Sequence, residues 1–165
     1  MSGRLFEARD LHIDIQNATR ISIVPSLSQI RKWICVIFRF VPMTVDTTTP
    51  ELTVRFVDQN ESAVLNKMYR HKKGPTNILS FSYDPVPGFS ANPLGDLAIC
   101  VSLVFEEAKI LNKPLESHFS HLFIHGILHL LGYDHIKKRE AVEMQRLEIA
   151  LLSQLGYENP YEGSC

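Results

Sequence analysis

The sequence has few cysteines, almost no net charge and no long apolar run. Its three cysteines, Cys35, Cys100 and Cys165, are odd in number and far apart, which argues against a disulfide framework and favours a reducing cytoplasm. Seventeen Lys and Arg residues balance eighteen Asp and Glu residues, so no global positive field indicates a nucleic-acid binder. The apolar runs are shorter than the roughly 20 residues of a membrane span. We therefore expect a cytoplasmic protein without a membrane partner.

The length and composition are those of one globular domain. The chain has 165 residues, of which 45% are hydrophobic and 21% charged. A chain of this size is expected to form a single domain that buries about 70% of its unfolded surface. We therefore predict one domain over residues 1–165, and any site for a polyanion must be local rather than spread over the surface.

The first half of the chain alternates between strand and helix patterns. Residues 11–15 alternate as a short strand, and Ser26 or Ser28 is placed to cap a helix that runs to about Phe40. A Thr-rich segment at residues 44–50 indicates a loop. Beyond it the sequence predicts a strand near 52–56, a helix from an Asn60 N-cap to about His71, and strands near 79–83 and 97–101.

The second half is helical. Periodic apolar residues predict helices over about 102–112, 114–131 and 138–155, the last with Val142 and Leu151 facing inward. Gly132 is placed to end the middle helix, since glycine readily adopts the left-handed conformation. Strands followed by helices favour an α+β fold with a small, mostly mixed sheet and about five helices.

A histidine cluster in the middle helix is the most informative motif. The stretch H-G-I-L-H-L-L-G-Y-D-H places His125, His129 and His135 at offsets 0, 4 and 10, with a glycine at offset 7. Residues four apart on a helix have Cβ atoms about 5 to 6 Å apart, so both imidazoles can reach one metal ion. A turn at Gly132 then returns the chain toward the helix, so that His135 can reach the same ion. His121 lies eight residues before His129, about 12 Å along the helix, which is too far to share the ion.

Three nitrogen ligands and one open position are typical of a catalytic zinc site. A structural zinc site usually has four protein ligands, often cysteines, and the sequence has no paired cysteines. Zinc lowers the pKa of a bound water to about 7, which favours hydrolysis. We therefore predict one zinc ion per chain. His118 and His121 lie upstream of this motif and are expected to be ordinary helix histidines; the alternative for His121 is a role behind the ligands or facing the substrate.

The same histidine spacing occurs in zinc peptidases of the H-E-x-x-H-x-x-G-x-x-H type. There a glutamate after the first histidine is the general base, whereas here that position is Gly126. A peptidase or other amide hydrolase is therefore the weaker hypothesis.

A basic stretch ends the helix predicted before Gly74. Arg70, His71, Lys72 and Lys73 follow one another there. A guanidinium binds phosphate through two parallel hydrogen bonds and stabilises charge on a phosphoryl oxygen, so Arg70 is the candidate phosphate ligand. The alternative is a solvated helix end at which cations are favoured by the helix dipole.

Four motifs together resemble the YbeY family of bacterial zinc-dependent endoribonucleases. They are H-G-I-L-H-L-L-G-Y-D-H at residues 125–135, N-K-M-Y-R at 66–70, P-T-N-I-L-S-F at 75–81 and G-D-L-A-I at 95–99. The resemblance covers about residues 50–160. Two positions, Ile78 and Ser82, depart from the P-T-N-V-L-S-F-P form common in the family, and neither touches the proposed chemistry.

The resemblance implies a function and assigns roles to these residues. It implies an α+β fold, a zinc ion held by His125, His129 and His135, and a role for Arg70 in substrate binding or catalysis; we take Arg70 and His125 as catalytic. The implied substrate is single-stranded RNA, particularly the precursor of the small-subunit ribosomal RNA near its 3′ end, with a role in ribosome quality control. Ribosomes or ribosome-associated proteins are the implied partners, and DNA is not expected. The residues leave open a non-enzymatic ribosome-assembly factor with structural zinc.

Overall fold

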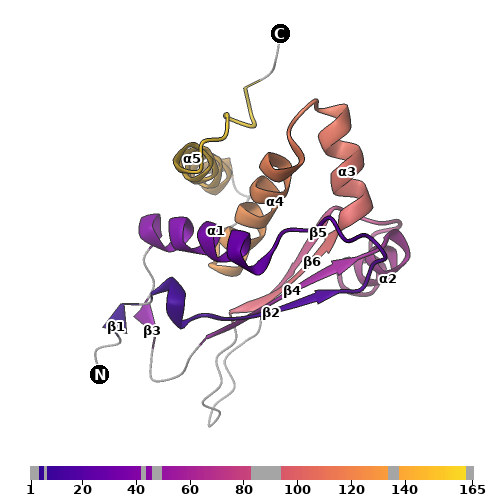
Figure 1. The fold of residues 1–165 in the computed structure, drawn as a ribbon, viewed down its shortest axis with the longest axis horizontal. Coiled ribbons are helices and arrows are strands. Elements are labelled where there is room, and N and C mark those ends of the chain that lie inside the picture. Colours follow the sequence, from indigo (N-terminus) through magenta and orange to yellow (C-terminus); the bar gives the residue numbers. More distant parts are fainter. Residues whose placement is uncertain are drawn as a thin grey trace.

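A four-stranded mixed sheet with helices on both faces forms the structure (Figure 1), confirming the predicted α+β fold. The sheet order is β2-β4-β6-β5. The computed structural model describes residues 4–5, 7–41, 44–45, 50–82, 94–133 and 138–162. Its elements are β1 (Arg4–Leu5), a 3-10 turn (Ala8–Asp10), β2 (His12–Asn17), α1 (Leu27–Phe40), β3 (Thr44–Val45), β4 (Glu51–Val57), α2 (Gln59–Arg70), β5 (Ile78–Phe81), β6 (Gly95–Cys100), α3 (Val101–Ile110), α4 (Leu115–Leu130) and α5 (Lys138–Gln154).

Three adjacent strands of the sheet, β2, β4 and β6, run parallel to one another. In β4, Val54 pairs with Ile15 of β2 and Leu97 of β6, both in parallel register. The edge strand β5 runs antiparallel to β6. The segment at 44–50 was predicted to be a loop, but Thr44–Val45 pairs with β1 as a separate two-stranded sheet. Short pairings of this kind have no periodicity by which the sequence could reveal them.

The main core lies between the sheet and helices α1 and α4. Trp33 of α1 and Phe123 of α4 are both buried, with ring centroids 5.3 Å apart, and α5 packs against both helices. On the opposite face, α2 packs on β6 over a smaller cluster around Val57, Leu79 and Cys100. Helix α4, which carries the histidine motif, is therefore fixed by neighbours on several sides. Within the described ranges, no helix is long and apolar enough to cross a membrane.

Two further local predictions were wrong. The N-cap of α2 is Asp58 instead of Asn60, because the Asp58 carboxylate accepts a hydrogen bond from the Glu61 backbone N–H at 2.8 Å. In α5, Val142 was predicted to face inward but is 50% exposed, and the buried stripe is formed by Met144, Glu148, Leu151 and Leu152. The prediction placed only apolar residues on the buried face of α5, so it missed Glu148, which is buried there.

Of the two predicted caps of α1, the structure selects Ser26. Its hydroxyl accepts a hydrogen bond from the Gln29 backbone N–H at 3.2 Å, and the Gln29 side chain accepts one from the Ser26 backbone N–H at 3.0 Å. We expect Ser26→Ala to lower the free energy of unfolding by about 1 kcal/mol, because a backbone donor at the helix start loses its partner. Urea denaturation measures the change. Ser28→Ala is the matched control and should stay within about 0.5 kcal/mol of the parent; equal losses in both variants would contradict the assignment.

Candidate metal centre and nucleic-acid interface

His125 and His129 lie one helical turn apart on α4, with their rings directed toward each other. The two Nε2 atoms are 3.0 Å apart, and the rings meet edge-on with centroids 4.6 Å apart. Two nitrogen ligands of one tetrahedral zinc ion are about 3.4 Å apart when each bond is about 2.1 Å. The two imidazoles therefore fit a shared ion with only a small adjustment.

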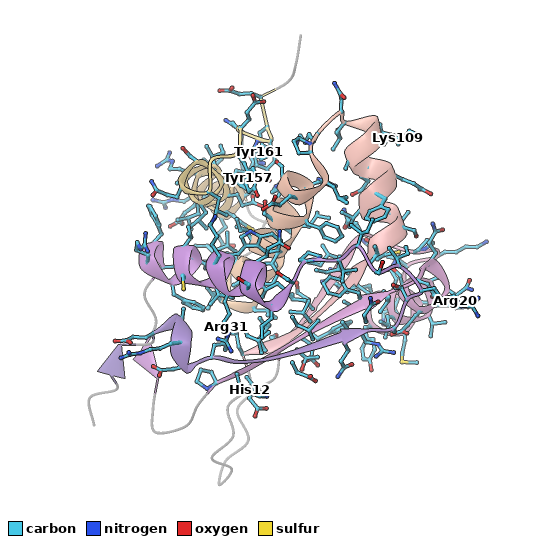
Figure 2. All side chains as sticks on the ribbon, viewed as in Figure 1. His12, Arg20, Arg31, Lys109, Tyr157 and Tyr161 are labelled. Atoms are coloured by element: carbon cyan, nitrogen blue, oxygen red, sulfur yellow. The ribbon has the colours of Figure 1, made fainter. Side chains whose placement is uncertain are left out.

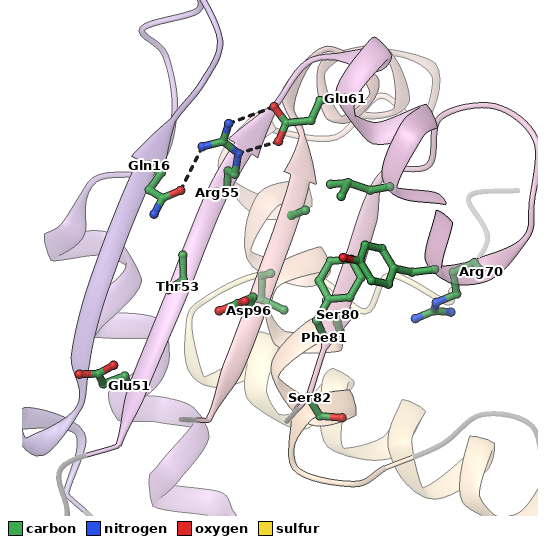
Figure 3. A pocket seen from close by; sticks show the side chains of 14 residues that line it. Gln16, Glu51, Thr53, Arg55, Glu61, Arg70, Ser80, Phe81, Ser82 and Asp96 are labelled. Atoms are coloured by element: carbon green, nitrogen blue, oxygen red, sulfur yellow. Dashed lines mark hydrogen bonds and ion pairs between the residues drawn. The ribbon is translucent and has the colours of Figure 1, made fainter. Parts of the chain in front are cut away.

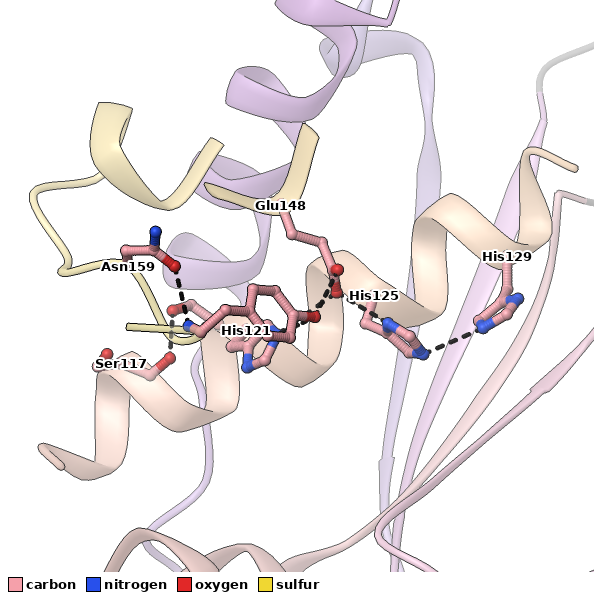
Figure 4. Close-up of polar contacts among 8 residues, drawn as sticks. Ser117, His121, His125, His129, Glu148 and Asn159 are labelled. Atoms are coloured by element: carbon pink, nitrogen blue, oxygen red, sulfur yellow. Dashed lines mark hydrogen bonds and ion pairs between the residues drawn. The ribbon is translucent and has the colours of Figure 1, made fainter. Parts of the chain in front are cut away.

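Glu148 of α5 holds His125 from the other side. Its Oε1 lies 2.8 Å from His125 Nδ1, and its side chain is 1% exposed (Figure 4). Burial raises the pKa of Glu148, but hydrogen bonds from His121, His125 and Tyr161 outweigh burial and lower it to about 2. The carboxylate is therefore ionised at neutral pH and accepts the proton of His125 Nδ1. That tautomer directs the lone pair of Nε2 toward His129, as a metal ligand requires.

The third predicted ligand, His135, lies outside the described residues. Within the described part of the chain, no group of three or more His, Cys, Asp or Glu side chains is arranged to hold an ion. The two histidines that are described nevertheless fit one, on their spacing and on the carboxylate behind His125.

Gly126 faces the sheet instead of the histidine pair. A Cβ built on this glycine would lie 2.7 Å from Ile78 Cδ1, 2.9 Å from Leu97 Cδ2 and 3.2 Å from Ser80 Oγ. The position at which zinc peptidases carry their glutamate is therefore filled by strands β5 and β6. This packing weighs against the peptidase hypothesis independently of the residue type.

The two upstream histidines take different places. His118 is buried, and its Nε2 lies 2.8 Å from Glu107 Oε1; Asn77 donates hydrogen bonds to the same carboxylate at 3.1 and 3.2 Å. This cluster ties α4 to α3 and to the start of β5. His121 Nε2 lies 3.4 Å from Glu148 Oε1, so this residue stands behind His125 instead of beside the histidine pair.

Arg70 is the last residue of α2, and a hydrogen-bonded turn fixes the chain just after it. The Asn66 amide donates to the Gly74 carbonyl at 2.8 Å, while the Ser62 hydroxyl donates to the Thr76 carbonyl and accepts from the Thr76 N–H. His71 closes the helix in the left-handed conformation, with a φ of 56°. The N-K-M-Y-R motif thus supplies both the turn, through Asn66, and the exposed arginine.

A groove of about 940 Å³ runs over the face of the sheet that carries α2 and reaches Arg70 (Figure 3). Two arginines line it. Arg55 is already occupied, because Glu61 binds its guanidinium at 2.6 and 3.1 Å and Gln16 accepts a further hydrogen bond. Among the described residues, none forms an ion pair with Arg70. Arg70 is therefore the groove cation that can bind an incoming phosphate.

The edge strand β5 lies between Arg70 and the histidine helix. On one side, Phe81 of β5 packs against Tyr69, the neighbour of Arg70, with ring centroids 5.0 Å apart. On the other side, the Ser80 hydroxyl donates to the carbonyl of Gly126 at 3.2 Å, next to His125. Successive residues of one strand thus contact the arginine end of α2 and the histidine-bearing turn of α4, which places the two predicted sites on either side of the same strand.

Comparison with known proteins decides the family. The family model described as Endoribonuclease YbeY matches residues 13–156. The chain belongs to this family. Curated proteins named Endoribonuclease YbeY from three Coxiella burnetii strains, Dugway 5J108-111, RSA 331 / Henzerling II and CbuG_Q212, are each 53% identical to it over 152 residues, covering 92% of this chain and 99% of the relative.

A solved structure shares the YbeY fold of this chain. The solution structure of TM1509 from Thermotoga maritima aligns with a TM-score of 0.53 and 22% identity, covering 92% of this chain and 99% of the other. At this identity the likeness supports the fold alone. The predicted family and the predicted α+β architecture are both confirmed.

Sequence reasoning missed Glu148 and Tyr161 in this member of the YbeY family. The Tyr161 hydroxyl donates to Glu148 Oε2 at 2.7 Å. One signal was available: Glu148 lies at helical spacing between Met144 and Leu151 on the buried stripe of α5. A charged residue on an apolar stripe indicates a buried partner.

Proposed function

We propose that the protein is a metal-dependent endoribonuclease specific for single-stranded RNA. The observation that carries the proposal is the pair of imidazole nitrogens 3.0 Å apart, held by a buried carboxylate, across one edge strand from Arg70. Membership of the YbeY family supports an RNA substrate and a metal-dependent hydrolysis. We further propose that the substrate is the ribosomal RNA precursor near the 3′ end of the small-subunit RNA, and that the enzyme works in the cytoplasm with the ribosome, in rRNA maturation and ribosome quality control.

The metal in this proposal is one zinc ion per chain. His125, His129 and His135 would hold it, since three nitrogen ligands leave one position open to substrate. When bound, the ion supplies Lewis-acid stabilisation of charge on a phosphate oxygen. Glu148 keeps His125 in the ligating tautomer and accepts its proton in an ionic hydrogen bond, which makes the imidazole a stronger ligand.

Arg70 has the second role. Its planar guanidinium binds a phosphate through two parallel hydrogen bonds and stabilises the charge that develops on the phosphoryl oxygens. The turn after α2 reduces the freedom of the chain that carries Arg70, so less conformational entropy is lost when a phosphate binds. The groove beside it is lined by Tyr69 and Phe81, aromatic side chains of the kind on which unpaired bases stack.

The test is cleavage of a single-stranded RNA by purified, zinc-reconstituted protein. We expect the parent to cut and both Arg70→Ala and His125→Ala to lose cleavage. Equal cutting by all three would identify a contaminating nuclease and overturn the proposal. RNA that is bound but not cut by the parent would indicate a non-enzymatic ribosome-assembly factor instead.

Arg70→Ala is expected to slow cleavage about a hundredfold, the usual effect of losing one donor to transition-state charge. It should also lower the slope of log affinity against log salt by about 0.7, because one phosphate contact on a single strand is lost. RNA affinity at several salt concentrations measures this. Arg39→Ala, at the exposed end of α1, is the control and should keep both rate and slope. An unchanged slope in Arg70→Ala would remove Arg70 from the site.

A further inference from the structure

The segment after α5 folds back onto the histidine helix. The Tyr157 N–H donates to the Leu152 carbonyl at 2.9 Å and turns the chain, and the Asn159 side chain accepts a hydrogen bond from the Tyr161 N–H at 2.8 Å. As a result the Tyr161 side chain lies beside α4 and α5 (Figure 2), with its hydroxyl 2.7 Å from Glu148 Oε2. A residue near the C-terminal end of the described chain thus reaches the carboxylate behind His125.

The two oxygens of Glu148 have separate partners. Oε1 accepts from His125 at 2.8 Å and lies 3.4 Å from His121 Nε2, whereas Oε2 accepts from the Tyr161 hydroxyl. Rotation of a carboxylate about its last bond moves both oxygens, so it breaks one hydrogen bond when one oxygen is held and at least two when both are held. The orientation in which Glu148 meets His125 is therefore set in part by Tyr161.

His121 supports the same arrangement from the side. Its ring meets the Tyr161 ring edge-on, with centroids 5.5 Å apart, and its Nε2 lies 3.3 Å from the Tyr161 hydroxyl oxygen. Burial and the ionised Glu148 raise the pKa of Tyr161, so the phenol keeps its proton and remains a donor. The tyrosine is thus fixed by both its ring and its hydroxyl.

We propose that Tyr161 is a positioning residue of the metal centre, whose hydroxyl holds Glu148 so that His125 turns its Nε2 toward the ion. The inference rests on the proposed function, since it requires that His125 bind a metal. It assigns to the C-terminal segment a part in setting metal affinity. Tyr161 reaches His125 through Glu148, whose Oε2 accepts the hydrogen bond of the tyrosine hydroxyl.

The first test is the zinc affinity of Tyr161→Phe, measured by competition with a chromophoric chelator at neutral pH. This variant keeps the ring and removes only the hydroxyl. We expect its affinity to fall about tenfold, the lower end of the effect of losing an outer-shell partner. Tyr157→Phe is the matched control, because Tyr157 is also a tyrosine with a raised pKa but its carboxylate partner is Glu116, on α4 away from the histidine pair.

The second test asks whether Tyr161 acts through Glu148. In a Glu148→Leu background the acceptor of the Tyr161 hydroxyl is already gone, so adding Tyr161→Phe should change zinc affinity less than twofold. A further tenfold loss in that background would show that the two residues act independently and would overturn the inference. So would parent-like affinity in Tyr161→Phe alone, or an equal loss in Tyr157→Phe.

The outcome for the proposed function is read separately, from parent protein and His125→Ala. If the parent binds zinc and His125→Ala does not, the metal centre stands whatever Tyr161→Phe shows. If the parent does not bind zinc, the proposed function itself fails and the inference fails with it.

Discussion

His129→Ala is expected to bind no stoichiometric zinc and to cleave RNA at least about a thousandfold more slowly than the parent, a loss of about 4 kcal/mol of transition-state stabilisation. The reason is geometric: His125 and His129 supply two nitrogens 3.0 Å apart, and removing one leaves too few ligands to retain the ion. Elemental analysis after gel filtration measures the metal, and initial rates on a single-stranded RNA measure the activity.

The control for this variant is His12→Ala. His12 is exposed at the start of β2, on the edge of the sheet opposite β5, so its loss should change neither zinc content nor rate. If His129→Ala retained one zinc per chain and cut RNA at the parent rate, the proposed site would be wrong.

Gly126→Glu, which restores the glutamate of the zinc peptidases, is expected to unfold the protein instead of creating a peptidase. The new side chain would have to enter the space between α4 and strands β5 and β6, where a Cβ alone meets Ile78 at 2.7 Å and Leu97 at 2.9 Å. Overpacking costs about 1 to 3 kcal/mol, and a buried carboxylate without a partner adds several more. The sum is comparable to the whole stability of a typical domain. Circular dichroism during thermal unfolding measures the effect.

Gly156→Glu is the matched control, because it makes the same chemical change where a Cβ meets nothing within 4 Å. Its φ of 85° imposes a cost of about 1 to 2 kcal/mol for a non-glycine residue, so a cooperative transition should remain. A Gly126→Glu protein that melted close to the parent would show that α4 can move away from the sheet, and it would reopen the peptidase hypothesis.

The histidine pair was predictable because its geometry is local. Two residues four apart on a helix must lie on one face, so the sequence alone brings His125 and His129 together, and the structure agrees. Glu148 was not predicted, because it lies 23 residues from His125 and meets it only when α5 packs on α4. The predicted ligands thus follow from helix periodicity, whereas the groups that contact them from other helices follow from tertiary packing.

The same distinction holds for Arg70 and for the sheet. The end of α2 was predicted from the turn residues after it, but the hydrogen bonds from Ser62 and Asn66 that hold this turn join residues 8 to 14 positions apart. The strands were predicted from their alternation, yet alternation does not say that β2 pairs with β4 and not with a later strand. Strand order depends on which faces the helices cover, and no local pattern records that.

The pairing of β2 with β4 bears on how small an active fragment of this enzyme can be made. All four motifs lie between residues 50 and 160, which suggests that the first third of the chain is dispensable. That third nevertheless supplies β2, which satisfies one hydrogen-bonding edge of β4, and α1, whose Trp33 packs on the helix of the histidines. A fragment restricted to the motifs would leave that strand edge open to pairing with other chains and would strip an apolar layer from α4. The four motifs lie in one part of the chain, but the sheet and helix that position them also require β2 and α1.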